Sequence, residues 1–146
     1  MPKIVGSIEI NASKDRVWEV ISDLDNEADY WWGTKEVRNI SKDGNVLSRE
    51  ITQNFRNHKI LQKVILTPKN EIETRYLKGL TEGVRFLKQE NIGENKQKVT
   101  ATWDVRFPGI YILLSYFLAR HIRKGTSDAL ARIKQASEGN RPISGS

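Results

Sequence analysis

The stretch that most constrains the fold is residues 109–139. Pro108 precedes it, no proline lies within it, and Gly139 is a typical end point for a helix. The sequence therefore predicts one helix of about 30 residues, ~45 Å long at 1.5 Å per residue. Its first half, residues 110–119, is apolar on nearly every side. Because such a run is too short to span a bilayer, we expect the rest of the chain to cover it from more than one side.

The second half of this stretch is amphipathic. Its small and apolar residues recur close to the helical period, and arginine or lysine occupies many of the other positions. These residues are Ile122, Gly125, Ala129, Leu130, Ile133 and Ala136. This face of the helix is expected to be the one that a sheet covers.

Alternation of apolar and polar residues predicts strands upstream of the helix. Two short helices are predicted after the first strand. One is capped by Asn11 or Ser13 and carries an apolar stripe through Val17 and Ile21, and the other lies in the aromatic segment 27–33. Glycine, proline, asparagine or aspartate occupies each gap between the later strands and favours tight turns there. The predicted strands are 3–11, 34–41, 46–55, 59–67, 71–78, 83–92 and 98–107.

Strands in series with short links indicate an antiparallel meander. A curved sheet of seven strands could bury one face on the final helix, which is an α+β arrangement. A chain of 146 residues is expected to form one domain, here residues 1–139, followed by a flexible tail at 140–146.

Composition excludes several classes of function. The chain has no cysteine, so disulfides, thiolate metal sites and a cysteine nucleophile are excluded. Two histidines, His58 and His121, cannot build a zinc site without cysteine, and we predict no metal. No serine-hydrolase, dinucleotide or phosphate-binding loop motif occurs, so we predict no cofactor.

The net charge of +6 favours acidic partners, but the 24 basic and 18 acidic residues are scattered along the chain. This pattern is typical of a solvated mixed surface, and we expect no nucleic-acid partner. The N-terminus lacks a secretory signal and no run of apolar residues could cross a membrane, so a cytoplasmic location is expected.

Two groups of residues carry a resemblance to a known superfamily. The first is Ile8, Ile10, Ala12, Val17, Trp18, Val20, Ile21, Asp23 and Leu24, with an aromatic residue at Trp31 or Trp32; the second is Ala129, Leu130, Ile133 and Lys134. With the order of elements, they resemble the START/Bet v 1-like superfamily, and within it the SRPBCC proteins labelled polyketide cyclase/dehydrase or lipid transport. The resemblance implies a helix-grip fold, with a cavity for apolar or amphipathic ligands between the sheet and the last helix. No catalytic residues are shared across the group, so none are assigned here.

Strand parity suggests which polar residues face that cavity. Arg49 and Gln53 share parity with apolar neighbours, Thr74 lies between Ile72 and Tyr76, and Lys88 and Glu90 share parity with Phe86. A buried arginine would require an anionic partner, which hints at a ligand with a carboxylate, phosphate or sulfate group. The alternative is that a bulge or a shift in register turns these groups to solvent. The full predicted lining is Tyr30, Trp31, Trp32, Arg49, Gln53, Thr74, Tyr76, Phe86, Trp103, Leu113, Leu114 and Phe117.

Three functions fit these expectations. The first is a non-catalytic carrier or sensor of a lipid-, quinone- or polyketide-like molecule. The second is an enzyme of cyclase or dehydratase type, in which Arg49 or Glu90 polarises or deprotonates the ligand. The third is a lipid or quinone chaperone that makes a weak contact with anionic membranes through residues 111–118 and the basic residues that follow. A monomer or weak dimer is expected.

Overall fold

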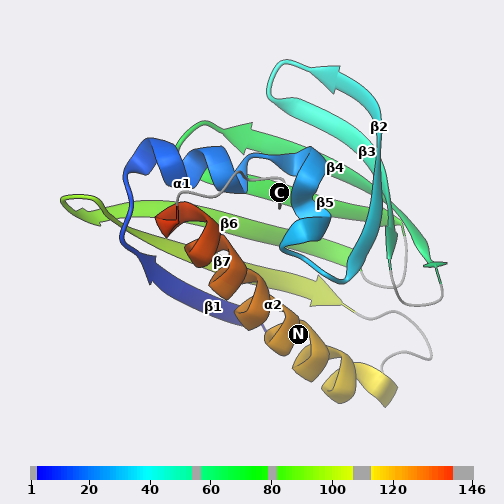
Figure 1. Ribbon diagram of the computed structural model, residues 1–146. Helices are drawn as coiled ribbons and strands as arrows, with labels where there is room; N and C mark the ends of the chain where they lie inside the picture. The colour runs from blue at the N-terminus through cyan, green and yellow to red at the C-terminus, as the bar shows by residue number, and fades with distance from the viewer. Residues whose placement is uncertain (1–2, 54–56, 79–81, 107–112, 140–146) are drawn as a thin grey trace.

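The computed structural model describes residues 3–53, 57–78, 82–106 and 113–139, which form a single antiparallel sheet with helices on one side (Figure 1). The elements in chain order are β1 (Lys3–Ile10), α1 (Lys14–Ile21), the 3-10 helix η1 (Leu24–Asp29), β2 (Thr34–Asp43), β3 (Val46–Gln53), β4 (Lys59–Thr67), β5 (Glu71–Lys78), β6 (Glu82–Gly93), β7 (Lys96–Arg106) and α2 (Ser115–Glu138).

The sheet has seven strands in the order β1-β7-β6-β5-β4-β3-β2. Strands β2 to β7 each pair with the next strand in sequence. Strand β1 pairs with β7 and forms the other edge of the sheet, with Lys3 opposite Asp104 and Ile10 opposite Gln97. The predicted α+β helix-grip fold is confirmed. The continuations predicted for two strands, to residues 55 and 107, fall outside the described residues.

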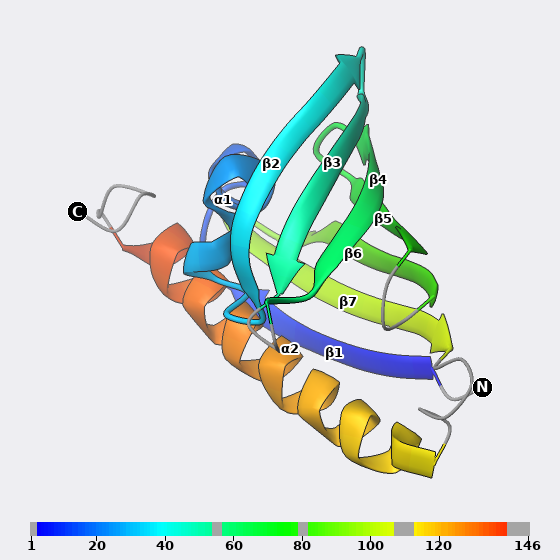
Figure 2. The ribbon, with the colours of Figure 1, turned by 90° about the vertical axis from the view of Figure 1, so that its right-hand side faces the viewer.

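Helix α2 lies along β1, and the sheet bends away from it toward β2 and β3 (Figure 2). Helix α1 and η1 follow β1 and cover the same face near the C-terminal end of α2. The concave face of the sheet is therefore enclosed by helices at one end, while the other end is bordered by α2 and the strand ends.

Helix α1 begins where the sequence supplies a cap. The Ser13 hydroxyl accepts a hydrogen bond from the Arg16 N–H at 3.1 Å, so Ser13 rather than Asn11 is the N-cap. Val17, Val20 and Ile21 are buried on the face toward the sheet. A buried aliphatic side chain of this size stabilises the fold by roughly 1.5–3 kcal/mol.

The main core joins α1, the sheet and the second half of α2. Leu130 and Ile133 are almost fully buried against Ile10, Val99 and other strand residues. The amphipathic face predicted for this half of the helix is therefore the face that packs.

The first half of α2 differs from its prediction. In the described part of the chain the α-helix begins at Ser115, and residues 109–112 of the predicted helix lie outside the described residues. Gly139 has φ −88° and ψ 168°, so it ends the helix in an extended rather than a left-handed conformation.

For the described residues of this first half, the expected enclosure is also wrong. Leu113 is 83% exposed and Phe117 67% exposed, and Leu114 and Tyr116 are exposed beside them. Burial begins at Ala119, because the first turn of α2 lies at the end of the helix farthest from α1 (Figure 2). The concave sheet covers the later turns and leaves an apolar surface at the start.

Candidate ligand-binding cavity

A cavity of about 330 Å³ lies between the concave face of the sheet and the middle of α2. Its sheet side is formed by β2, β3, β5, β6 and β7, and its opposite side by α2 and the segment after η1. The lining residues are Trp31, Trp32, Gly33, Thr34, Ile51, Gln53, Tyr76, Arg85, Trp103, Leu118, His121, Ile122, Gly125, Thr126, Asp128 and Arg132.

Three aromatic side chains form one wall of the cavity. The Tyr76 ring stacks on Trp103 with 5.7 Å between centroids, and the Trp31 ring meets Trp103 edge-on at 6.0 Å. The Trp103 Nε1–H donates to Thr126 Oγ1 at 2.9 Å, which ties this wall to α2. The wall is consequently apolar and fixed in orientation.

Three charged side chains are buried behind and beside this wall. Glu27 Oε1 accepts a hydrogen bond from Arg49 Nη2 at 2.8 Å and from Arg85 Nη2 at 3.4 Å. Arg49 is fully buried, and Glu27 and Arg85 are 5% and 4% exposed. Among these residues only Arg85 lines the large cavity.

The two arginines differ in how many of their N–H groups have hydrogen-bond partners. Arg49 also donates from Nε to Gln62 Oε1 at 2.8 Å and from Nη1 to the Leu24 carbonyl oxygen at 3.4 Å, so it holds η1 against β3 and β4. In the described part of the chain, Arg85 Nε has no hydrogen-bond partner. Its guanidinium carbon lies 4.3 Å from the centroid of the Trp31 ring and 5.3 Å from that of Trp103.

The two arginines keep Glu27 ionised. Burial acts to raise the pKa of the Glu27 carboxyl, but the positive charges of Arg49 and Arg85 outweigh it, and its pKa is lowered from 4.5. Burial raises the pKa of the Tyr76 phenol, which therefore stays protonated at neutral pH. Since arginine is protonated throughout this range, the buried cluster carries one negative and two positive charges.

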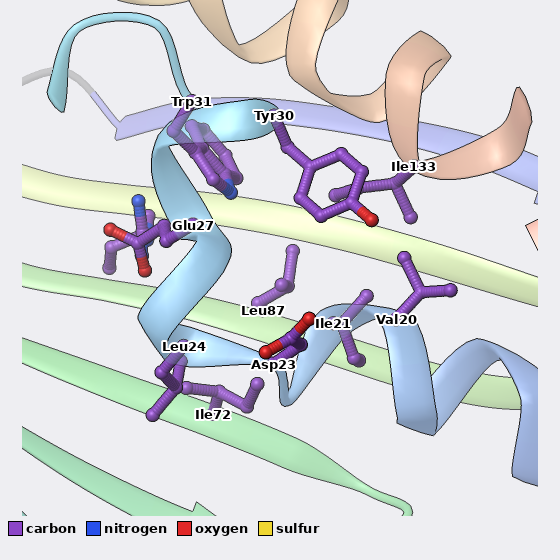
Figure 3. A pocket seen from close by; sticks show the side chains of 11 residues that line it. Val20, Ile21, Asp23, Leu24, Glu27, Tyr30, Trp31, Ile72, Leu87 and Ile133 are labelled. Atoms are coloured by element: carbon purple, nitrogen blue, oxygen red, sulfur yellow. The ribbon is translucent and has the colours of Figure 1, made fainter. Parts of the chain in front are cut away.

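A second, much smaller cavity lies at the end of the fold covered by α1 and η1 (Figure 3). Glu27 and Trp31 extend from the chain at η1, Ile72 and Leu87 come from the sheet, and Ile133 comes from α2. Its volume is about 10 Å³, close to the minimum that holds one water molecule. Side chains therefore fill this end of the concave face, and the 330 Å³ cavity is the part left open.

The structure brings together part of the predicted lining. Trp31, Trp32, Gln53, Tyr76 and Trp103 all line the large cavity. Arg49 and Thr74 lie on the concave face as predicted, but both are fully buried and neither lines the cavity. Tyr30 lines the small cavity instead.

The other predicted lining residues lie elsewhere. Phe86 faces the convex side of the sheet together with exposed Lys88 and Glu90, so the parity assigned to β6 was the opposite of the one observed. In β6 the inward-facing residues are Arg85, Leu87 and Gln89, two of them polar, which is why apolar alternation pointed to the wrong face. Leu113, Leu114 and Phe117 neither close nor line the cavity, since Leu118 and Ile122 supply the helix side.

Sequence reasoning missed Arg85 and Glu27. Arg85 had a usable signal, because it shares parity with apolar Leu87 in the predicted strand 83–92. Glu27 had none. Its burial depends on the backbone of η1, which the local sequence of mostly polar residues does not specify.

Two other kinds of feature are absent from the described residues. Within residues 3–53, 57–78, 82–106 and 113–139, no group of three or more histidine, aspartate or glutamate side chains is placed to hold a metal ion. In the same part of the chain, no helix is long and apolar enough to cross a membrane.

Comparison with known proteins identifies the relatives of this chain. A family model described as polyketide cyclase / dehydrase and lipid transport matches residues 1–138. A search of curated protein sequences finds no match.

Solved structures share the fold at low sequence identity. The Zhui aromatase/cyclase from a Streptomyces species is 14% identical with a TM-score of 0.79, covering 94% of this chain and 93% of that one. TTHA0849 from Thermus thermophilus is also 14% identical at a TM-score of 0.79, covering 93% and 97%. A START superfamily protein from Mycobacterium smegmatis is 15% identical at a TM-score of 0.71, covering 91% and 97%.

Proposed function

Because the chain belongs to the polyketide cyclase/dehydrase and lipid transport family of the START/Bet v 1-like superfamily, we propose that it binds a hydrophobic or amphipathic small molecule in the 330 Å³ cavity. In this proposal the protein is a carrier or sensor, and the ligand is lipid-, quinone- or polyketide-like. The observation that supports it is the open, largely apolar cavity beside a packed core.

The size and lining of the cavity agree with this role. Small-molecule sites are concave, mostly apolar and about 300–1,000 Å³ in volume, with a few polar groups that orient the ligand. Here Trp31, Tyr76 and Trp103 supply the apolar wall, and Arg85 supplies a polar group on the same side. An apolar ligand body would remove this aromatic surface from water, and each Å² of apolar surface removed contributes about 25 cal/mol.

Gly125 allows the cavity to be filled without damage to the core. It lies on α2 and lines the cavity, and among the described residues no atom lies within 4 Å of the place where its Cβ would be. Gly125→Leu should therefore occupy the cavity, while the matched control Gly125→Ala adds only a methyl group. Both changes should be tolerated, since replacing a helical glycine by alanine stabilises by roughly 0.5–1 kcal/mol.

The test compares the three proteins for uptake of 1-decanol and a short-chain quinone, measured by native mass spectrometry and tryptophan fluorescence. Wild type and Gly125→Ala should bind, and Gly125→Leu should lose at least about tenfold in affinity, or ~1.4 kcal/mol. Native mass spectrometry of the freshly purified protein should also show a co-purifying ligand. Failure of wild type to bind either probe, or equal binding by Gly125→Leu, would contradict the proposal.

A second candidate function is a cyclase- or dehydratase-type reaction in the same cavity. It is favoured by His121 and Tyr76, which both line the cavity and are residue types that serve as general acids or bases in enzymes. Arg49 and Glu90, the residues predicted for this role, do not line it. Incubation with a linear poly-β-ketone acid should then yield an aromatic chromophore, and His121→Gln should slow its formation. Absence of turnover by the wild type would remove this candidate.

We also propose the weak membrane contact expected of a lipid or quinone chaperone. Leu113, Tyr116 and Phe117 form an exposed apolar surface, and exposed Arg120 and Arg123 follow it on α2. Apolar side chains beside basic ones favour the surface of an anionic bilayer over a neutral one.

Sedimentation with phosphatidylserine vesicles tests this contact. Wild type should pellet at low salt and be released at high salt, and Leu113→Ser combined with Phe117→Ser should stay in the supernatant. Val5→Ser is the control, since Val5 is an exposed apolar residue on β1. Wild type that does not pellet at low salt would overturn the contact, and ultracentrifugation without vesicles would show whether the same surface instead pairs two copies of the chain.

A further inference from the structure

The three buried charges near the cavity do not balance. Glu27 contributes one negative charge, and Arg49 and Arg85 contribute one positive charge each, so the cluster has a net charge of +1. All three side chains are almost completely removed from water. A buried charge without a partner is costly unless another group neutralises it.

The excess positive charge lies at Arg85. Glu27 Oε1 is 2.8 Å from Arg49 Nη2 but 3.4 Å from Arg85 Nη2, so the closer ion pair is the one with Arg49. Arg49 also has two further acceptors, the Gln62 side chain and the Leu24 carbonyl. Arg85 has only the longer contact with Glu27 among the hydrogen bonds of the described residues, and its Nε is unpartnered.

Arg85 is also held in place at the cavity wall. The Trp31 ring lies 4.3 Å from its guanidinium carbon and the Trp103 ring 5.3 Å from it. Of the three charged residues in the cluster, Arg85 alone lines the cavity. Its position is therefore fixed by two aromatic rings before any ligand arrives, which lowers the cost of ordering it on binding.

The other charged residues that line the cavity have partners of their own. Asp128 forms an ion pair with Lys124, with 3.0 Å between Asp128 Oδ2 and Lys124 Nζ. The Arg132 guanidinium lies 3.4 Å from the centroid of the Trp32 ring and donates to the Tyr30 carbonyl oxygen at 2.9 Å. Neither residue forms an ion pair with Arg85 in the described structure, so Arg85 is the charged lining residue whose set of partners is incomplete.

We infer that the cavity selects an acidic amphiphile, with its carboxylate bound to Arg85 and its apolar body against the Trp31, Tyr76 and Trp103 wall. The inference rests on the proposed function, since it requires that the cavity takes a small molecule. Arginine offers a planar pair of donors that matches a carboxylate, and such charge-assisted hydrogen bonds are about twice as strong as neutral ones. Bound there, a carboxylate would supply the missing negative charge and bring the cluster to neutrality.

The test compares two probes that share one apolar chain, decanoate and 1-decanol, by isothermal titration calorimetry at neutral pH. Wild type should bind decanoate at least about tenfold more tightly than 1-decanol, a difference of ~1.4 kcal/mol. Arg85→Met keeps the apolar stem and removes the charge, so it should lose the preference and bind the two probes about equally. Arg75→Met, on an exposed arginine of β5, should keep the wild-type preference.

The outcomes separate the inference from the proposed function. Equal affinity of wild type for the two probes, or a preference that persists in Arg85→Met, would overturn the inference and leave the proposed function intact. Failure of wild type to bind either probe would overturn both. If Arg85→Met does not fold, Arg85→Lys replaces it. That variant keeps the positive charge but lacks the paired N–H donors of the guanidinium. If its preference for decanoate over 1-decanol is as large as that of wild type, the role assigned to the guanidinium is overturned.

Discussion

The Arg85 guanidinium lies on the Trp31 ring, with 4.3 Å between its central carbon and the ring centroid. This contact joins the aromatic segment after η1 to the first half of β6, two parts of the chain separated by more than fifty residues of sequence. A desolvated contact of this kind contributes roughly 2 kcal/mol. It also orients both partners at the cavity wall, so the pair contributes both to stability and to the proposed ligand binding.

The two adjacent tryptophans should differ in their effect on stability. Trp31 is buried in the core, whereas Trp32 is 63% exposed. Trp31→Ala should lower the free energy of unfolding by about 3–5 kcal/mol. Trp32→Ala should lower it by less than about 1 kcal/mol, as for most exposed positions. Urea unfolding followed by circular dichroism measures both, and equal losses would show that the assigned burial is incorrect.

Removing Glu27 should be strongly destabilising. Glu27→Gln leaves Arg49 and Arg85 buried without a carboxylate, and breaking a buried ion pair in this way typically costs about 3–5 kcal/mol. Glu19→Gln is the matched control, because the Glu19–Arg16 pair is largely exposed and such pairs contribute about 1 kcal/mol or less. The comparison uses the free energy of unfolding at neutral pH. A Glu27 variant as stable as the control would mean that the cluster does not hold η1 in place.

Stability should fall on acidification in part through Glu27. Its pKa in the folded protein lies below the ordinary value of 4.5, because the two arginines outweigh the effect of burial. A carboxyl group with a lowered folded-state pKa adds stability above its unfolded-state pKa and loses it as pH falls through the folded-state value. The free energy of unfolding should thus decrease more steeply from about pH 5 to about pH 3 in wild type than in Glu27→Gln. Parallel curves would contradict this assignment.

Truncations along α2 should show which half of the helix is packed. Leu130 is buried in the main core and Leu114 is 48% exposed. Leu130→Ala should cost about 2–5 kcal/mol, whereas Leu114→Ala should cost less than about 1 kcal/mol. Thermal or chemical unfolding of the two variants gives the comparison. A large loss at Leu114 would indicate that the start of the helix is covered after all.

The strands and the helix order were predictable because they depend on local patterns. Alternation placed Ile51, Val99 and Val105 on the inner face correctly, and the Ser13 cap followed from the residue type at the start of α1. The same rule failed in β6, where Arg85 and Gln89 face inward and Val84 and Phe86 do not. Alternation identifies the apolar face of a strand, so it fails when polar residues are buried through partners distant in sequence.

The site was only partly predictable for the same reason. Arg49, Gln53 and Tyr76 share the parity of core residues and were placed on the concave face. Glu27 belongs to a mostly polar segment, and its burial is decided by two arginines 22 and 58 residues away. No local pattern contains that information.

The sequence alone determined the order of the elements, the sheet with its C-terminal helix, and the superfamily, because periodicity and turn residues act over a few neighbouring positions. Only the tertiary structure decided which of residues 113–139 are buried and which are exposed. The helix is packed where the concave sheet reaches it and exposed at Leu113 and Phe117, where the sheet does not. The curvature of the sheet sets that boundary, and the open cavity lies where Trp103 of the sheet and Ile122 of the helix line the same space.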